Sequence, residues 1–259
     1  MRRAALRLAV LALSALPAAA PAVLPDEIQV YTDDLEKPGE TGVELHVNTT
    51  PRGRTVPNFP GEVVPDHGLR LTPEISRGIN RDMDWGLYLP FVREAEGNVR
   101  FAGPKLRFKW LPLRPTEGGA GWFGGVNLEY AMLGRGFEPG TRALELRPIL
   151  GYRNRDWLLS LNPILAWQLN GPERGGSPEF TPAFKLARAV APGTALGVET
   201  YSDLGRLNEH LPHEAQAHTM FFTLDHEAKT WGLNFGVGRG LTSAADRWTI
   251  KAIVSLPLP

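Results

Sequence analysis

The chain has 259 residues, no cysteine, and 28 basic and 28 acidic residues, so its formal net charge is zero. A balanced charge gives no global field toward nucleic acid, and we expect no nucleic-acid partner. Without cysteine the chain has no disulfide, no thiol nucleophile and no thiolate metal site. Abundant Gly (28) and Pro (23), together with 7 Trp and 11 Phe, favour many short strands joined by turns.

Residues 1–22 have the features of a secretory signal peptide. A basic start is followed by a mostly apolar run over residues 4–16, and Ala20-Pro21-Ala22 fits a small-x-small cleavage site. The run is too short to cross ~30 Å of hydrocarbon as a helix. We therefore expect export and cleavage before Val23. Residues 23–40 are acidic and turn-rich, and we interpret them as an N-terminal periplasmic segment with a lid or a plug as its candidate role.

The rest of the chain alternates apolar and polar residues with a period of two, which is the signature of β-strands. In residues 231–238 (WGLNFGVG), every odd position is large and apolar and every even position is Gly or Asn. Twelve such segments lie near residues 41–49, 68–78, 83–92, 98–111, 121–133, 142–153, 156–169, 178–188, 194–203, 217–226, 230–239 and 247–257. Their lengths suit tilted membrane strands, which need ~9–11 residues. The period of two, with Pro and Gly inside the segments, excludes helix as the main element.

A soluble β-sandwich or lipocalin-like barrel also alternates, but with its apolar face inward. Two features favour a membrane barrel instead. Aromatic residues gather near segment ends, as an interfacial girdle requires: Trp85, Trp110, Trp122, Trp157, Trp231 and Trp248. Tight joints also alternate with longer polar ones, although the joint over 112–120 is longer than this scheme requires. We predict an all-β fold, a single antiparallel up-and-down transmembrane β-barrel of about 12 strands over residues 41–259, with apolar side chains facing lipid.

Several motifs mark the turns between these segments. They include TPEI at 72–75, GI at 78–79, DWGLYLP at 84–90, GPKLRFK at 103–109 and GRGLT at 238–242. Over most of the mature chain the sequence resembles outer-membrane barrel proteins known as transporters of a meta-pathway of phenol degradation, and their uncharacterised proteobacterial relatives. The resemblance implies passage of small, including aromatic, molecules. The motifs mark strand–turn–strand geometry and no catalytic group.

If the apolar face meets lipid, the polar face fills the lumen. Hairpin register places Lys105 opposite Glu129 and Arg107 opposite Asn127, and it places Glu129 opposite Glu145 and Asn127 opposite Arg147. Opposite side chains lie ~5 Å apart, so these charges can form one cluster. The candidate lumen or binding residues are Lys105, Arg107, Asn127, Glu129, Glu145 and Arg147. Two interpretations remain open, a polar constriction that contacts solute and a salt-bridged plug that fills the barrel.

Two further groups of residues could carry chemistry. His210, His213 and His218, with Glu214 between them, straddle a polar loop without a spacing that converges the imidazoles, and we expect no metal site there. Ser202 and His218 lie near the outer ends of adjacent segments, as a lipid hydrolase would need. No nucleophile motif supports that activity, so we expect no catalytic residue.

The sequence therefore predicts a Gram-negative outer-membrane pore or transporter for small solutes that is not an enzyme and needs no cofactor. Its expected partners are outer-membrane lipid, an unidentified small solute and the barrel-assembly machinery. The alternatives are a plugged barrel without transport, a soluble periplasmic lipocalin-like binding protein, and an outer-membrane lipid hydrolase.

Overall fold

The computed structural model describes residues 27–116 and 119–258, so the expected signal peptide lies outside the described residues. The described chain is almost entirely β-structure, with a single 3-10 turn, η1 (His213–Ala215). Among the described residues there is no helix long and apolar enough to cross a membrane.

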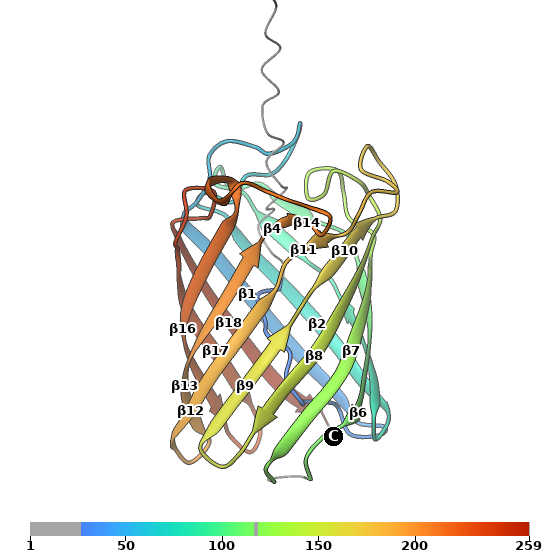
Figure 1. Ribbon diagram of the computed structural model, residues 1–259, viewed down its shortest axis with the longest axis vertical. Coiled ribbons are helices and arrows are strands. Elements are labelled where there is room, and N and C mark those ends of the chain that lie inside the picture. The colour runs from blue at the N-terminus through green and yellow to red at the C-terminus, as the bar shows by residue number, and fades with distance from the viewer. Residues whose placement is uncertain (1–26, 117–118, 259) are drawn as a thin grey trace, which may run out of the picture.

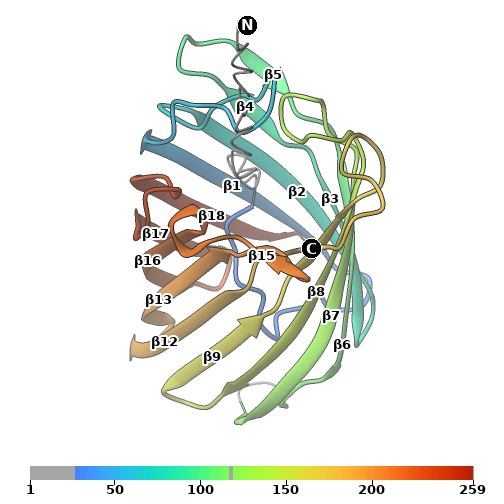
Figure 2. The ribbon, with the colours of Figure 1, turned by 45° about the horizontal axis from the view of Figure 1, so that its top comes forward.

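Twelve antiparallel strands form the wall of a closed barrel (Figures 1 and 2). They are β1 (Thr41–Arg52), β2 (Leu69–Asn80), β3 (Met83–Tyr88), β6 (Lys105–Leu113), β7 (Gly121–Ala131), β8 (Ala143–Arg153), β9 (Trp157–Asn162), β12 (Ala183–Ala191), β13 (Thr194–Asp203), β16 (Ala217–Glu227), β17 (Gly232–Gly240) and β18 (Trp248–Leu258). Each pairs with the next, and β1 pairs with β18 to close the sheet. Closure leaves no wall strand with an unpaired edge in the membrane, as a spanning sheet requires.

Short strands extend the wall beyond breaks at proline. They are β4 (Phe91–Arg93), β5 (Val99–Phe101), β10 (Leu165–Gln168) and β11 (Glu179–Phe180). The breaks fall at Pro90, Pro104, Pro163 and Pro182, because proline has no N–H to donate to the ladder. The sequence merges each short strand with its neighbour into one segment, and the predicted count of twelve is confirmed. Two further pieces, β14 (Gly205–Arg206) and β15 (Glu209–His210), lie in a loop that the sequence left without structure.

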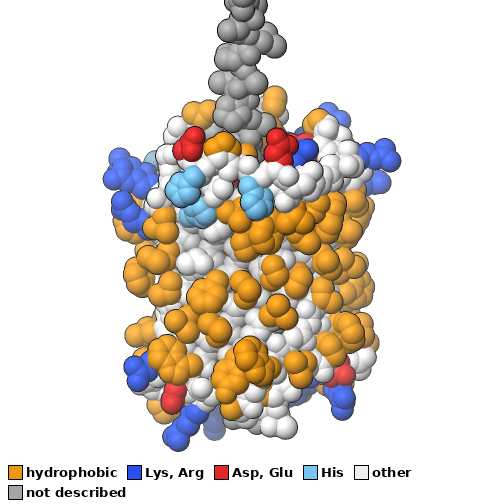
Figure 3. Space-filling model, in the orientation of Figure 1, with side chains coloured by type: hydrophobic (Ala, Val, Ile, Leu, Met, Phe, Trp, Pro, Cys, Tyr) orange, Lys and Arg blue, Asp and Glu red, His pale blue; other side chains and the backbone are white. Residues whose placement is uncertain are grey.

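The two faces of the wall differ as the alternation predicts. In β6, Phe108 and Trp110 are 44% and 49% exposed, whereas Lys105 and Lys109 are 8% and 9% exposed. Figure 3 shows apolar side chains over the middle of the outer surface and charged ones at its two ends. The outer surface therefore has the apolar band of a membrane barrel, and a soluble barrel with an apolar interior is excluded.

The two rims differ in the length of their connections. At the lower rim in Figure 1, where the chain ends, β2 and β3 are joined through Arg81 and Asp82 alone. At the upper rim, residues 53–68 join β1 to β2, and residues 132–142 join β7 to β8. Short turns are typical of the periplasmic rim of such barrels and long loops of the outer rim, and we use those names below.

Residues 27–40 run inside the barrel and join β1 at the periplasmic rim (Figures 1 and 2). We call them the strap. The sequence assigned this stretch to a periplasmic segment with a lid or plug as its role. In the structure it occupies the lumen, because its main chain and its carboxylates pair with polar side chains of the inner wall.

Candidate functional site

Tyr31 attaches the strap to the centre of the wall. Its N–H donates to Asn162 Oδ1 (2.7 Å), and its carbonyl accepts from Ser160 Oγ (2.6 Å) and Asn162 Nδ2 (3.1 Å). Its hydroxyl lies 2.7 Å from the hydroxyl of Tyr88 on the far wall. An irregular segment needs such partners when buried, because an unpaired main-chain group costs about 1–3 kcal/mol. The strap therefore crosses the lumen from β9 to β3.

Cations of the wall surround the ring of Tyr31. Arg147 Cζ lies 4.5 Å from the ring centroid and Lys109 Nζ lies 5.0 Å from it. Nearby, Lys251 Nζ donates to the carbonyl of Ile28 (2.9 Å). These contacts stabilise the strap by cation–π attraction and charge-assisted hydrogen bonding.

The lower part of the strap binds β2 and β3. The N–H of Glu36 donates to Asp84 Oδ2 (3.2 Å), and Ser76 Oγ donates to Glu36 Oε1 (2.9 Å). At Gly78 a side chain is impossible, since a Cβ there would lie 2.1 Å from the carbonyl oxygen of Lys37. The strap therefore lies directly against the backbone of β2.

The predicted charged cluster exists, but with one error of register. The pairing of β7 with β8 is as predicted, with Glu129 opposite Glu145 and Asn127 opposite Arg147. The pairing of β6 with β7 is two residues away from the prediction, with Arg107 opposite Glu129. A shift by two leaves each side chain on the same face, so the charges still meet in the lumen.

Within this cluster, cations and carboxylates pair closely. Lys105 Nζ lies 2.7 Å from Glu129 Oε1, and Arg147 Nε lies 2.8 Å from Glu145 Oε1. The strap takes part as well, because Glu27 Oε1 lies 3.4 Å from Arg147 Nη1. Asn127 is fully buried in the same wall. The six candidate residues thus line one lumen, but Arg107 belongs to a neighbouring group.

Arg107 holds two carboxylates on the periplasmic side of the cluster. Its Nε and Nη2 lie 2.8 and 2.7 Å from Glu74 Oε1, and its Nη1 binds Asp84 Oδ1. All three side chains are almost completely buried. On the opposite wall, the carboxylate of Glu199 forms ion pairs with Lys251 and Lys185. Lys185 Nζ lies 3.1 Å from Glu199 Oε1. The inner wall is therefore a network of paired charges on both sides of the strap.

Tyr88 contacts the strap but was missed by the sequence analysis. It shares the inward face of β3 with Asp84, at two-residue spacing, and it is fully buried. Counting by two from Asp84 would have found it. The partners of Tyr31 had no such signal, because the strap has no periodic pattern of its own.

Two cavities enter the barrel from opposite rims. The periplasmic vestibule has a volume of about 480 Å³ and is lined by strap residues 29–32 and 34–36. The outer vestibule has a volume of about 310 Å³ and is lined by strap residues Glu27, Ile28 and Gln29. Acidic side chains outnumber basic ones in both linings, by nine to five in the first and six to four in the second. The strap thus separates two polar, net acidic vestibules.

Loops cover the outer vestibule. In the 53–68 loop, the N–H of Arg54 donates to Asp246 Oδ1 (2.8 Å) of the loop before β18, and the N–H of Gly53 donates to Asp66 Oδ1 (2.8 Å). The bond from Gly53 lowers the pKa of Asp66, while burial raises the pKa of Asp246. The bond to Asp246 holds the 53–68 loop against the loop before β18, and the bond from Gly53 to Asp66 closes the 53–68 loop on itself.

The predicted neighbours Ser202 and His218 do lie opposite each other, on β13 and β16. Ser202 Oγ is 2.8 Å from His218 Nδ1, and Gln216 Oε1 is 3.1 Å from His218 Nε2. The N–H of Ser202 donates to the carbonyl of Pro182, and that of His218 donates to Thr242 Oγ1. Acyl transfer requires hydrogen-bond donors that stabilise an oxyanion, and neither of these two N–H groups is available for that.

The loop histidines do not converge. The rings of His213 and His218 are 5.9 Å apart, whereas His210 stacks against Phe180 with ring centroids 6.3 Å apart. In the described part of the chain these three histidines form no group with donor atoms close enough for one metal ion.

No protein-family model matches the sequence, and no curated protein is similar to it in sequence. Several solved structures share its fold. The COG4313 outer membrane channel from Pseudomonas putida F1 has a TM-score of 0.60 at 12% identity, covering 90% of this chain and 100% of that one. KdgM porin has a TM-score of 0.52 at 11% identity, covering 84% and 99%. NanC porin has a TM-score of 0.50 at 10% identity, covering 84% and 100%. The chain therefore has the fold of outer-membrane channel and porin barrels.

Proposed function

We propose that this protein is an outer-membrane channel for small solutes, and that the strap closes it. The observation that carries the proposal is the pair of vestibules, which enter from opposite rims and are separated by strap residues around Gln29. Residues 38–40 pair with the backbone of Gly78 on β2, whereas residues 27–37 belong to no strand of the wall, so they can move without opening the barrel. The plugged and the conducting barrel are then two states of one molecule.

The lining supports a preference for neutral or cationic solutes. Acidic side chains are in excess in both vestibules, and a fixed negative charge attracts cations and repels anions along a narrow path. The outer vestibule also presents aromatic faces, from Phe137, Tyr201 and Phe221. Passage of small aromatic compounds, which the family resemblance implies, fits these faces and is part of the proposal.

The setting of the barrel is also part of the proposal. We infer that the chain is exported to the periplasm, inserted by the barrel-assembly machinery, and surrounded by outer-membrane lipid. An enzymatic role is not proposed, because the N–H groups of Ser202 and His218 are both engaged in hydrogen bonds of the wall and its loops, and the observations that carry the proposal lie in the lumen.

The test is to weaken the attachment of the strap without touching a charge. The double substitution Ser160→Ala and Asn162→Ala removes the three hydrogen bonds to the main chain of Tyr31. At about 1 kcal/mol for each bond, the closed state loses roughly 3 kcal/mol, or about 100-fold in the ratio of closed to open barrels. Single-channel recordings should show a much higher open probability, with the open conductance unchanged.

Thr200→Ala is the matched control, since Thr200 follows buried Glu199 on β13 and lies on the outward face of the wall. It should record like the parent. An open probability that is the same in all three proteins, or a parent that conducts fully with the strap attached, would rule out the strap as the closing element.

A further inference from the structure

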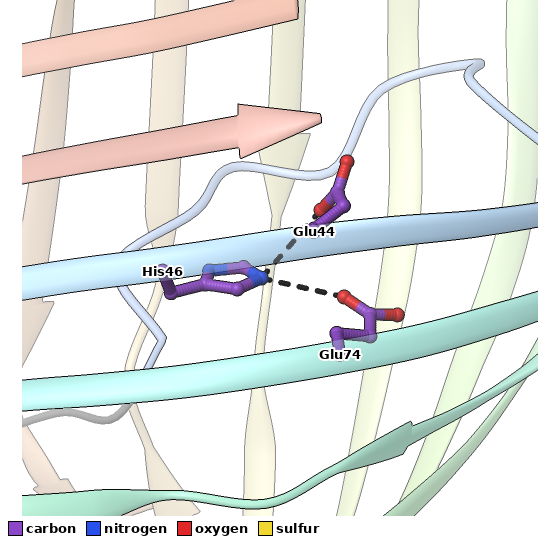
Figure 4. Close-up of side chains that lie close together, drawn as sticks. All are labelled: Glu44, His46 and Glu74. Atoms are coloured by element: carbon purple, nitrogen blue, oxygen red, sulfur yellow. Dashed lines mark hydrogen bonds and ion pairs between the residues drawn. The ribbon is translucent and has the colours of Figure 1, made fainter. Parts of the chain in front are cut away.

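Three potential metal ligands meet on the inner wall of β1 and β2, close to the periplasmic vestibule. Glu44 and Glu74 are directly opposite in the β1–β2 ladder, and His46 follows Glu44 on the same face. Their donor atoms all lie within 4.8 Å of one another. Figure 4 shows both carboxylates directed at the same nitrogen, Nε2 of His46.

The distances from His46 Nε2 to the two carboxylates match the spacing of ligands around a metal ion better than the length of a hydrogen bond. His46 Nε2 lies 3.3 Å from Glu74 Oε2 and 3.5 Å from Glu44 Oε2. A charge-assisted N–H···O bond is ~2.7–2.9 Å long, so both contacts are stretched. Ligands at ~2.0–2.1 Å from a tetrahedral Zn²⁺ are about 3.3–3.4 Å apart, which is close to the observed spacing.

The second oxygen of each carboxylate is held by the wall. Ser255 Oγ donates to Glu44 Oε1 (2.7 Å), and Arg107 Nε donates to Glu74 Oε1 (2.8 Å). Each carboxylate therefore has one oxygen fixed and the other turned toward His46. Partners of this kind orient metal ligands in known sites, and their loss weakens binding.

Charge and access favour a divalent ion. Arg107 is shared by Glu74 and Asp84, so it does not balance Glu44 as well. Glu36 of the strap and Lys109 of β6 line the same vestibule. At this site the four carboxylates Glu36, Glu44, Glu74 and Asp84 outnumber the two cations Arg107 and Lys109. The Glu44 side chain is 24% exposed, whereas His46 is completely buried, so an ion can enter past Glu44 and keep one position toward water.

We propose that Glu44, His46 and Glu74 form a binding site for a divalent transition-metal ion of the Zn²⁺ class in the periplasmic vestibule. One imidazole with two carboxylates is a donor set that suits Zn²⁺, whereas Ca²⁺ takes six or more oxygen ligands. The site is independent of whether the barrel conducts.

The experiment is calorimetric titration of the folded mature protein, freed of metal with a chelator, with ZnCl₂ alone. We expect saturable binding of one Zn²⁺ per barrel. His46→Gln and Glu44→Gln should abolish it, and Ser255→Ala should weaken the affinity about 10-fold by releasing Glu44. Co²⁺ alone should give the intense visible absorption of a four-coordinate ion in the parent and lose it in His46→Gln.

His226→Gln is the matched control, because His226 also lies on a strand but contacts Thr194 and Trp231 instead of carboxylates. It should bind Zn²⁺ like the parent. Heat-modifiable migration of each variant verifies folding, and Ser255→Ala, which removes no charge, carries the test if a ligand variant does not fold. Unsaturable binding, equal affinity in His46→Gln and His226→Gln, or equal affinity for Ca²⁺ and Zn²⁺ would overturn the assignment.

Discussion

Replacing both Lys105 and Arg107 with Gln should make the barrel more cation-selective and less stable. Lys105 lines the outer vestibule and Arg107 the periplasmic one, so the change removes one positive charge on each side of the strap. Their carboxylate partners, Glu129, Glu74 and Asp84, remain in place. The same double change therefore acts on the solute path and on the buried ion pairs.

Both effects can be sized. A monovalent ion passing ~5 Å from a fixed charge in water feels about 0.8 kcal/mol, so each lost charge changes cation and anion passage by about 4-fold in opposite directions. The permeability ratio should therefore shift by on the order of 10-fold for each charge at low salt, and less at high salt. For stability, Arg107 dominates, because Glu74 and Asp84 are each only 1% exposed. Breaking such a buried pair costs about 3–5 kcal/mol.

Reversal potentials across a salt gradient measure the first effect, and urea unfolding in detergent measures the second. Arg239→Gln is the control, because Arg239 is exposed on the outer surface, over Trp248. It should leave the reversal potential unchanged. A stable double variant with parental selectivity would mean that these two cations neither line the path nor hold the wall.

Three further predictions follow from other parts of the chain. The protein should fractionate with outer membranes and migrate faster on gels before heating than after it; recovery from the soluble periplasm would contradict a membrane barrel. Because a bond from Gly53 lowers the pKa of Asp66, the stabilisation it gives the 53–68 loop is present above the carboxylate's ordinary pKa and is lost as the pH falls through the lowered value. Pepsin should thus cut this loop faster as the pH falls through that value, and trypsin should cut it faster at neutral pH in Asp66→Asn than in the parent; identical cleavage of variant and parent would count against it. Gly238→Val should destabilise the barrel by about 1–3 kcal/mol in urea, because a Cβ there would lie 2.5 Å from the ring of Phe221, and a neutral result would show that the ring can move aside.

The wall was predictable because the alternation with a period of two shows both where a strand lies and which of its side chains point toward lipid or toward the lumen. Segment 194–203 coincides with β13 (Thr194–Asp203), and the other segments differ from the strands mainly at breaks such as Pro90 and Pro163. The pairing of β6 with β7 was wrong by two residues because the two strands do not end together. The last pair is Leu113 with Gly124, so residues 121–123 of β7 extend past β6, whereas a simple hairpin count pairs them with it. The side chains were still assigned to the correct face, because a shift by two residues equals the period of the strand.

The strap was not predictable in the same way. Its contacts join residues far apart in sequence, such as Tyr31 with Asn162, and a short acidic stretch carries no sign of which wall residues it will meet. The three donors around His46 are a similar case. Glu44, His46 and Glu74 are recognisable as inward residues, but their convergence depends on the β1–β2 register, which a loop of residues 53–68 does not determine.

The position of the strap also constrains how the barrel assembles. The strap precedes β1 in the chain, yet it contacts β3 through Asp84, β9 through Asn162 and β18 through Lys251. The β1–β18 seam joins the two ends of the sheet and cannot form until β18 has been delivered. A strap still outside at that moment would have to enter the lumen lengthwise through one rim and reach its partners one after another. We therefore expect it to be enclosed as the sheet curls around it, so that the strap serves as an internal template whose loss slows closure of the seam.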